Sequence, residues 1–317
     1  PPRSTLFPYT TLFRSVSRDF VFLYEQWFME DIRTTGLGLT RSPEFDAAYA
    51  QTLRSVLDRH VPDLGFRGVI CFDIETIPLV WGDRTDGPGL YPRTDQGPRH
   101  ADLWHDWLSA NESGLLAGRS VEERERILKR TYDGAVRLWL ERTFTEVRRL
   151  RPRAELAMYG LPAGSRYGQY TWSEPNRWKA MNDELRWLVD LQDVTVLVMY
   201  QTRKVLPRGE RSPGLPVITY DDAAAYVTDN VAEARRIAPT KPLLALVCLW
   251  YPDTSGAFDG WLDAPALEAS LVETKKAGVD ALILWHHFKK ATSRDDFQRA
   301  LNAVPLRLLR EHWTRDR

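Results

Sequence analysis

The sequence lacks the main features of membrane proteins and nucleic-acid-binding proteins. Within its 317 residues, no apolar run approaches the roughly 20 residues that a membrane-spanning helix needs. Lys plus Arg and Asp plus Glu each number 43, so no net charge attracts a nucleic acid or a membrane surface. We therefore expect neither partner. Hydrophobic residues make up 43% of the chain, which indicates an ordinary globular protein.

Cysteine is scarce, with Cys71 and Cys248 only. We expect no disulfide between them, because side-chain alternation along their strands directs them to opposite sides of the sheet. This usage neither requires nor excludes an oxidising compartment. His100 and His105 lie five residues apart without a third ligand in the sequence, so we expect no metal site and no cofactor.

The amino-terminal segment is unlike the rest of the chain. Thr5-Leu-Phe-Pro-Tyr-Thr-Thr-Leu-Phe-Arg-Ser15 resembles the translation of a sequencing-library adapter. We therefore expect residues 1–15 to be foreign, and residues 16–317 to form a single catalytic domain. The native amino terminus would then be absent, together with any export signal.

The most informative stretch is Arg67–Glu75, an apolar run entered through glycine that predicts a buried parallel strand. Asp73 and Glu75 stand two residues apart at its carboxyl end, so both side chains point to the same side. Neighbouring carboxyl groups can share one proton, and ligands bind at this end of parallel strands. We predict that Glu75 is a general acid and Asp73 its partner. The alternative is an acidic strand end that simply meets solvent.

Strands and helices alternate along the rest of the chain. Strands are expected to start near residues 19, 67, 154, 194, 242 and 280, each followed by a helical pattern. This alternation predicts a parallel sheet covered by helices. Four strands end in a residue suited to sugar chemistry, which favours a (β/α) barrel with its site at the carboxyl ends. These residues are Glu75, Tyr200, Tyr251 and Trp285.

Local signals predict where individual helices begin. Ser42 is expected to cap a helix that runs to about residue 60, and Ser120–Glu123 form a capping box for a helix that reaches about residue 150. The apolar residues of the first of these helices are expected on one face, and they are Phe45, Tyr49, Leu53, Val56 and Leu57. Asp221 or Asp222 is expected to cap a later helix. A further helix should open at Asp263 and close at a glycine, residue 278.

Two segments leave alternatives open. Glu25 lies at the exit of a strand expected over residues 19–27, where it either joins the site or is an ordinary loop charge; the usual exposure of Glu favours the loop charge. Residues 76–118 are rich in Gly, Pro, Asp and Trp and predict a long functional loop. Its aromatic residues either line a sugar groove or pack the loop on itself. They are Trp81, Tyr91, Trp104 and Trp107.

In order and spacing, these residues resemble the hyaluronidase family of glycoside hydrolases over about residues 20–290. No single motif is decisive, because Asp-x-Glu alone is common. The resemblance implies an α/β fold, a distorted TIM-like (β/α) barrel of about seven strands, of which the first is missing or replaced here. The matching motifs are Asp73-Ile74-Glu75 with Trp81, Tyr159-Gly160-Leu161-Pro162, Met181-Asn182-Asp183 with Trp187, Tyr200, Val231–Ala234, Tyr251 and Trp285.

The resemblance implies a retaining, substrate-assisted mechanism. The 2-acetamido carbonyl of a bound N-acetylhexosamine attacks the anomeric carbon, which is an exception to the usual two-carboxylate rule. Glu75 would protonate the glycosidic oxygen, with its pKa raised by Asp73 and by aromatic walls.

The resemblance also implies which residues bind the substrate. Tyr251 and Tyr200 would hold the acetamido group, and Trp285 would form the floor under the sugar ring. For the two tyrosines the alternative is packing at the barrel rim, and for Trp285 it is a place in the core. Tyr159 and Trp81 complete the expected substrate-binding set.

Departures from the family pattern weaken the choice of substrate. Ile74 replaces a tryptophan, and the cysteines of animal members are absent, which suggests a trimmed microbial relative. A polyanionic glycosaminoglycan such as hyaluronan or chondroitin would need basic residues. The alternatives are a glycosidase for a neutral or chitin-like polysaccharide and a non-catalytic carbohydrate-binding barrel. We expect a monomer, and a polymeric substrate suggests secretion. The candidate basic residues are Arg203, Lys204, Arg208 and Arg211.

Overall fold

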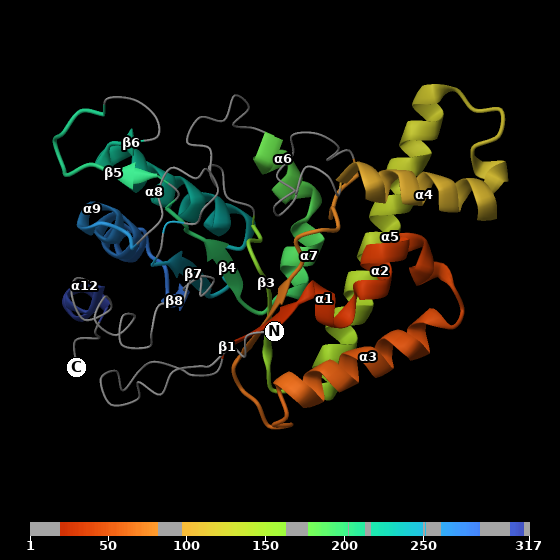
Figure 1. The fold of residues 1–317 in the computed structure, drawn as a ribbon, viewed down its shortest axis with the longest axis horizontal. Coiled ribbons are helices and arrows are strands. Elements are labelled where there is room, and N and C mark those ends of the chain that lie inside the picture. The colour runs from red at the N-terminus through yellow and green to blue at the C-terminus, as the bar shows by residue number, and fades with distance from the viewer. Residues whose placement is uncertain are drawn as a thin grey trace. The chain divides into compact units, whose positions relative to one another are not determined.

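The computed structural model describes residues 20–81, 97–162, 177–201, 203–212, 217–249, 251, 261–285 and 305–313. These residues form two compact units. The first unit lies within residues 20–158 with Leu191–Asp193, and the second within residues 159–190 and 194–313. Each unit contains a three-stranded parallel sheet (Figure 1). The single catalytic domain stays a prediction, and residues 1–15 lie outside the described residues.

The sheet of the first unit has the order β1-β2-β3, formed by β1 (Phe20–Tyr24), β2 (Val69–Asp73) and β3 (Glu155–Met158). All five residues of β2 are buried, because a central parallel strand is covered on both faces. The strand expected over residues 19–27 is shorter than predicted. It ends at Tyr24, which pairs with Asp73, and the chain turns at once into a helix.

The described residues of this unit also form seven helical segments, of which the two longest, α3 and α5, lie side by side (Figure 1). The predicted capping box of α5 is confirmed: the Ser120 hydroxyl accepts from the Glu123 N–H, and the Glu123 carboxylate accepts from the Ser120 N–H. The segments are α1 (Glu25–Phe28), α2 (Glu30–Thr35), the 3-10 helix η1 (Leu37–Arg41), α3 (Phe45–His60), α4 (Gly97–Asn111), the 3-10 helix η2 (Ser113–Leu115) and α5 (Val121–Leu150).

The predicted N-cap of α3 is wrong. The helix begins at Phe45 behind Glu44, and no side chain caps it. Ser42 instead follows η1 and accepts the Phe45 N–H at its carbonyl, so it forms a turn before the helix. The predicted apolar face is nevertheless buried, since it depends on spacing and not on the exact start. Its residues are Phe45, Tyr49, Leu53, Val56 and Leu57.

The long loop expected over residues 76–118 contains a helix. Residues 97–111 form α4, in which Ala101, Trp104 and Leu108 are buried at spacings of three and four. This periodicity was present in the sequence but was hidden by the Gly, Pro and Asp residues around it. The prediction of a continuous loop is therefore wrong for the part that the structure describes.

The sheet of the second unit has the order β4-β7-β8, formed by β4 (Thr195–Val198), β7 (Leu243–Cys248) and β8 (Ala281–Trp285). These are the strands that were expected to start near residues 194, 242 and 280. Two short strands, β5 (Lys204–Val205) and β6 (Val217–Ile218), pair with each other between β4 and the next helix.

The helices of the second unit mostly start where polar caps predict, but one cap was misassigned. Thr219 caps α8, and Asp222 is the third residue of its capping box. Asp222 therefore completes the cap and does not form it. The Asp263 cap and the positive φ of Gly278 are confirmed. The segments are α6 (Arg177–Glu184), α7 (Arg186–Leu191), α8 (Tyr220–Ile237), α9 (Ala264–Glu268), the π-helical turn η3 (Ala269–Glu273), α10 (Thr274–Lys276) and α12 (Pro305–Trp313).

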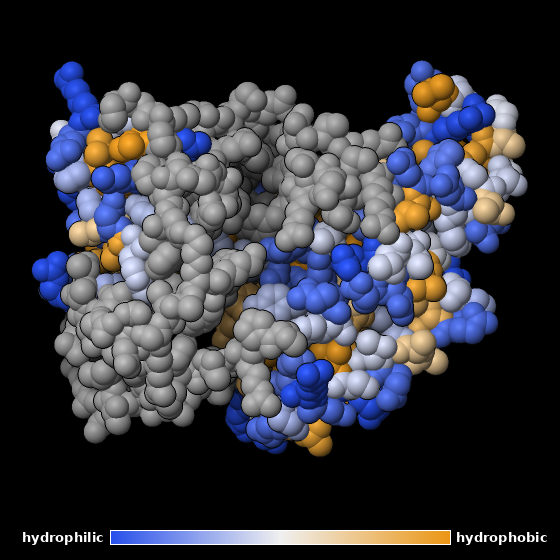
Figure 2. Space-filling view, viewed as in Figure 1, coloured by the Kyte–Doolittle hydropathy of each residue, from blue (hydrophilic) through white to orange (hydrophobic). Residues whose placement is uncertain are grey.

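The surface of the described residues is mixed in polarity. Figure 2 shows hydrophobic residues lying among polar and charged ones on the coloured part of the visible face. Large exposed hydrophobic side chains include Leu64, Leu115 and Val121. Across the described ranges, no helix combines the length and the apolar character required to cross a membrane.

Candidate functional site

Three carboxyl groups gather at the carboxyl end of the sheet in the first unit. Asp73 ends β2, Glu75 follows two residues later, and Glu25 follows the last residue of β1. The register places Tyr24 opposite Asp73, so the exits of β1 and β2 lie side by side. We call Glu25, Asp73 and Glu75 the acid cluster. The intervening Ile74 is buried at 1% exposure, as expected for a side chain directed away from the two acids.

Asp73 is the most perturbed acid of the cluster. Its side chain is buried, and its Oδ1 has no hydrogen-bond partner in the described part of the chain. Burial raises the pKa of Asp73 well above its ordinary 3.8, and the nearby charges of Glu75 and Glu25 raise this pKa further. The raised pKa of Asp73 favours its protonated form more strongly than that of an isolated Asp.

Glu25 is not an ordinary loop charge, and the reading favoured from the sequence is wrong. The residue is 6% exposed, and its Oε2 accepts the backbone N–H groups of Glu75 at 2.8 Å and Thr76 at 2.9 Å. No local pattern reveals this contact, because the partners are 50 and 51 residues apart. The one sequence signal was the position of Glu25 at a strand exit.

Replacing Asp73 by Asn should change how stability depends on pH. Because the folded state raises the pKa of Asp73, folding retains a proton that the unfolded chain loses above pH 3.8. The wild type therefore loses stability as pH rises from about 4 through the folded pKa. Asp73→Asn removes this loss, so its urea midpoint should exceed that of the wild type at pH 7 and approach it near pH 3.8.

Asp102→Asn is the matched control, because Asp102 is exposed on α4. Its urea midpoint should follow that of the wild type at every pH. A difference between wild type and Asp73→Asn that stays constant from pH 3.8 to 7 would contradict a titrating, buried Asp73.

The predicted sugar-binding residues Tyr200, Tyr251 and Trp285 all belong to the second unit. They lie at or just beyond the ends of β4, β7 and β8. These strands are parallel neighbours, so the three positions share one edge of the sheet. Tyr200 and Tyr251 are each 5% exposed. Their convergence with the acid cluster in one cleft stays a prediction.

Tyr159 also lies in the second unit, where it forms a parallel bridge with Val196 of β4. It is 6% exposed. The Tyr-Gly-x-Pro motif continues through Gly160, which has a positive φ, to Pro162. A contact of Tyr159 with sugar stays a prediction.

Trp81 packs within the first unit. Its indole N–H donates to Glu125 at 2.7 Å, its backbone N–H donates to Asp133 at 2.8 Å, and its ring lies against Tyr132 of α5. Trp104 is fully buried and stacks on Trp107, so these two rings pack the segment on α5. For this segment the packing alternative is the one that the structure shows, and a sugar contact of Trp81 stays a prediction. Tyr91 lies outside the described residues.

Two of the matching motifs meet each other in the second unit. Asn182 of α6 donates to Glu233 of α8 at 3.0 Å, and both side chains are buried. Arg236 pairs with Glu233 at 2.7 Å and with Asp183 at 2.7 Å. These residues therefore join two helices, a structural role that the sequence analysis did not assign.

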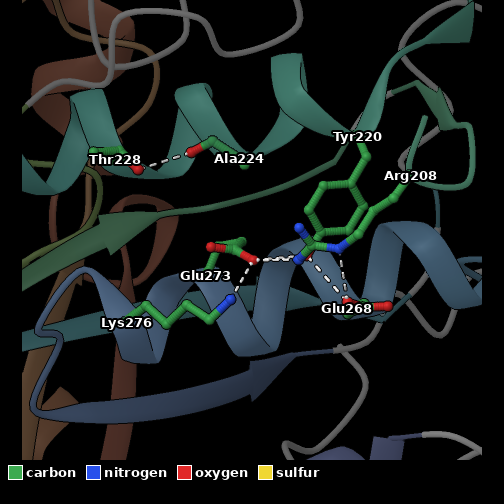
Figure 3. Close-up of polar contacts among 7 residues, drawn as sticks. All are labelled: Arg208, Tyr220, Ala224, Thr228, Glu268, Glu273 and Lys276. Carbon is green, nitrogen blue, oxygen red and sulfur yellow. Dashed lines mark hydrogen bonds and ion pairs between the residues drawn. The ribbon is translucent and has the colours of Figure 1, made fainter. Parts of the chain in front are cut away.

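Arg208, one of the four candidate glycan-binding cations, already has partners (Figure 3). Its guanidinium donates to Glu273 at 2.7 Å and to the Tyr220 hydroxyl at 2.7 Å, and it pairs with Glu268 at 3.3 Å. Lys276 pairs with the same Glu273 carboxylate at 3.0 Å. Arg208 therefore ties the segment after β5 to the helices after β7 and adds little free positive charge for a polyanion.

An open cavity of about 470 Å³ lies beside this cluster, between residues 209–212 and residues 219–221. Its lining includes carboxylates at Glu210 and Asp221 beside the cation of Arg211. Of the candidate substrate-binding residues, Arg211 lines it, whereas the predicted sugar-binding tyrosines and tryptophans do not. The cavity therefore does not coincide with the site that the sequence predicts.

Neither a disulfide nor a metal cluster is found where the chain is described. Cys71 and Cys248 are both buried thiols, and no disulfide joins them. Within the described residues, no group of three or more His, Cys, Asp or Glu side chains is placed to hold a metal ion. Two residues of the acid cluster, Glu25 and Asp73, are buried.

Comparisons with known proteins show which proteins this chain resembles. No protein-family model matches the chain. The hyaluronidase of Apis mellifera is 26% identical, in an alignment that covers 75% of this chain and 56% of that protein. The chain therefore spans little more than half the length of this curated relative.

Solved structures of bee venom hyaluronidase are similar over nearly the whole chain. One, a complex with a hyaluronic acid tetramer, has a TM-score of 0.71 at 19% identity and covers 93% of this chain and 88% of its own. A monoclinic form has a TM-score of 0.69 at 20% identity and covers 92% and 87%. The expected α/β class, a distorted (β/α) barrel, is thereby confirmed, whereas the replaced first strand stays a prediction. The chain is thus similar in sequence to a hyaluronidase and similar in fold to the solved structures of bee venom hyaluronidase.

Proposed function

We propose that the chain is a glycoside hydrolase that cleaves N-acetylhexosamine linkages within a glycosaminoglycan, with retention of configuration. The observation that carries this proposal is the pairing of a buried Asp73 with Glu75 at the carboxyl end of β2. Such strand ends are where barrel enzymes hold their catalytic groups. The hyaluronidase-like sequence and fold support the same reaction class.

The acid pair supplies and then takes back one proton. Because the pKa of Asp73 is raised by burial and by Glu75, the pair retains a proton at pH values where an isolated Asp has lost it. Glu75, the more exposed of the two, passes the proton to the glycosidic oxygen as the bond to the anomeric carbon breaks. The 2-acetamido carbonyl of the substrate forms the new bond, and Glu75 later accepts a proton from the water that opens the oxazolinium ring.

The second unit would supply the sugar-binding surface. Tyr200, Tyr251 and Trp285 belong to neighbouring parallel strands, so they can act on one sugar residue. Tyr251 and Tyr200 hold the acetamido group against the anomeric carbon, and Trp285 lies under the ring. Tyr159 and Trp81 extend the surface for a polymer.

Hyaluronan is the first substrate to test, because one of the similar bee venom hyaluronidase structures is a complex with a hyaluronic acid tetramer. A neutral, chitin-like glycan is the second candidate. Its specific support is that Arg208, a cation expected to bind a polyanion, is already paired with Glu268 and Glu273. The net charge of zero also provides no general attraction for a polyanion.

Reducing-end release from hyaluronan, chondroitin and chitin oligomers tests the proposal directly. We expect cleavage of hyaluronan or chondroitin into oligosaccharides, and the first-formed product should keep its β configuration by NMR. Salt should weaken binding of the charged substrates, because exposed charge pairs are screened.

The glycans that are bound and cleaved distinguish between the candidate functions. Cleavage of chitin oligomers alone would select the neutral glycan, and binding without cleavage of any glycan would select the carbohydrate-binding alternative. An inverted first product would exclude attack by the 2-acetamido group.

A further inference from the structure

The Glu25 carboxylate is hydrogen-bonded to the backbone at Glu75, the proposed catalytic acid, and at the residue that follows it. One oxygen of its carboxylate accepts two consecutive N–H groups, those of Glu75 at 2.8 Å and Thr76 at 2.9 Å. We infer that Glu25 is a positioning residue, which fixes the direction of the Glu75 side chain through these two amides. The inference rests on the proposed function, in which Glu75 is the acid.

The position of these amides explains why they need a partner. The ladder between β1 and β2 ends at the pair Tyr24 and Asp73, so Glu75 and Thr76 lie beyond it. Buried N–H groups require an acceptor, and a carboxylate makes shorter and stronger hydrogen bonds than a neutral carbonyl. Two bonds to adjacent amides restrain the backbone dihedral angles around Glu75. They therefore restrain the direction in which its side chain leaves the chain.

The other end of the segment is also fixed. The Tyr132 hydroxyl of α5 donates to the Pro78 carbonyl at 2.8 Å, and Asp133 accepts the Trp81 N–H. Glu25 holds the beginning of the segment and α5 holds its end. A small displacement of a reacting group can lower a rate about a hundredfold, so such restraints affect turnover.

The negative charge of Glu25 also has an electrostatic effect on the acid cluster, and this effect can be measured separately from the positioning of Glu75. Its carboxylate helps to raise the pKa of Asp73, together with burial and Glu75. The other titratable groups that interact with the cluster are Cys71 on β2 and Arg33 on α2. Because a single oxygen of Glu25 accepts both amides, the carbonyl oxygen of a glutamine can replace it without the charge.

Glu25→Ala and Glu25→Gln, assayed on the glycan that the wild type cleaves, separate positioning from charge. Glu25→Ala should lower kcat tenfold to about a hundredfold with little change in KM. Glu25→Gln should restore most of this loss, and its pH–rate profile should shift to lower pH, because a charge that raises the pKa of Asp73 is gone. Glu112→Gln is the matched control, because Glu112 is an exposed glutamate between α4 and η2; it should behave as the wild type.

Amide hydrogen exchange tests the same inference without any turnover. Exchange at Glu75 and Thr76 should become faster in Glu25→Ala and stay slow in Glu25→Gln. If the wild type cleaves no glycan, the proposed function fails while this measurement still decides whether Glu25 restrains the segment. If Glu25→Ala does not fold, Glu25→Asp, whose carboxylate is one methylene shorter, should show the faster exchange.

Three results would overturn the inference. The first is unchanged exchange at both amides in Glu25→Ala. The second is faster exchange with an unchanged kcat. The third is an equal loss of kcat in the Ala and Gln variants with protected amides in Glu25→Gln, which would assign the effect to charge alone.

Discussion

Glu75→Gln should lower kcat for glycan cleavage about a hundredfold to ten-thousandfold, the range that a general acid contributes. A glutamine has nearly the same shape as a glutamate but cannot give up a proton to the glycosidic oxygen. Glu75 is only partly buried, and its backbone N–H would still bond to Glu25, so the fold should be retained. Substrate binding should change much less than kcat. Reducing-end release, together with binding of the same oligosaccharide, measures both effects.

Glu155→Gln is the matched control for this variant. Glu155 is exposed at the first residue of β3, on the same sheet but at its amino end. Its replacement should leave kcat unchanged. Equal rates of cleavage for wild type and Glu75→Gln, with both proteins folded by circular dichroism, would remove Glu75 from the reaction.

The elements of this fold that depend on neighbouring residues were predictable from the sequence. The buried strand β2 was indicated by an uninterrupted apolar run, and the start of α5 by its capping box. The apolar face of α3 was also predicted in full. In each case the pattern and the structure that it produces lie within a few residues, so no knowledge of distant contacts is needed.

The predictions that were wrong concern residues whose roles depend on contacts with residues distant in the sequence. Glu25 has the sequence neighbourhood of a loop charge and becomes buried only because β1 lies beside β2. Trp104 could belong to a sugar groove or to a core, and only its contacts with α5 decide between them. The carboxylate partners of Arg208 are also distant in the sequence, 60 residues away for Glu268 and 65 for Glu273. Residue type alone therefore could not separate a binding role from a structural one.

The largest expected loss of stability is at Trp139, where α5 meets α3. Its side chain is fully buried, and its indole N–H donates to the Tyr49 hydroxyl at 2.9 Å. That hydroxyl also bonds to Thr143 at 2.8 Å, one turn further along α5. Trp139→Ala removes the ring and leaves a cavity, so it should lower the free energy of unfolding by about 3–5 kcal/mol. Urea denaturation followed by circular dichroism measures this change.

Tyr49→Phe separates the contribution of the buried hydrogen bond to the free energy of unfolding from that of the packing of the indole ring. The phenylalanine keeps the ring but leaves the Trp139 N–H without its acceptor, so the cost should be about 1–3 kcal/mol. Arg137→Ala, an exposed substitution on the same helix, should stay within about 0.5 kcal/mol of the wild type. A loss in Tyr49→Phe as large as that in Trp139→Ala would show that the buried hydrogen bonds, and not the packing of the indole, hold α3 against α5. Because Phe144 of α5 lies against Phe72 of β2, the same packing supports the strand that carries Asp73, so destabilised variants should also lose turnover.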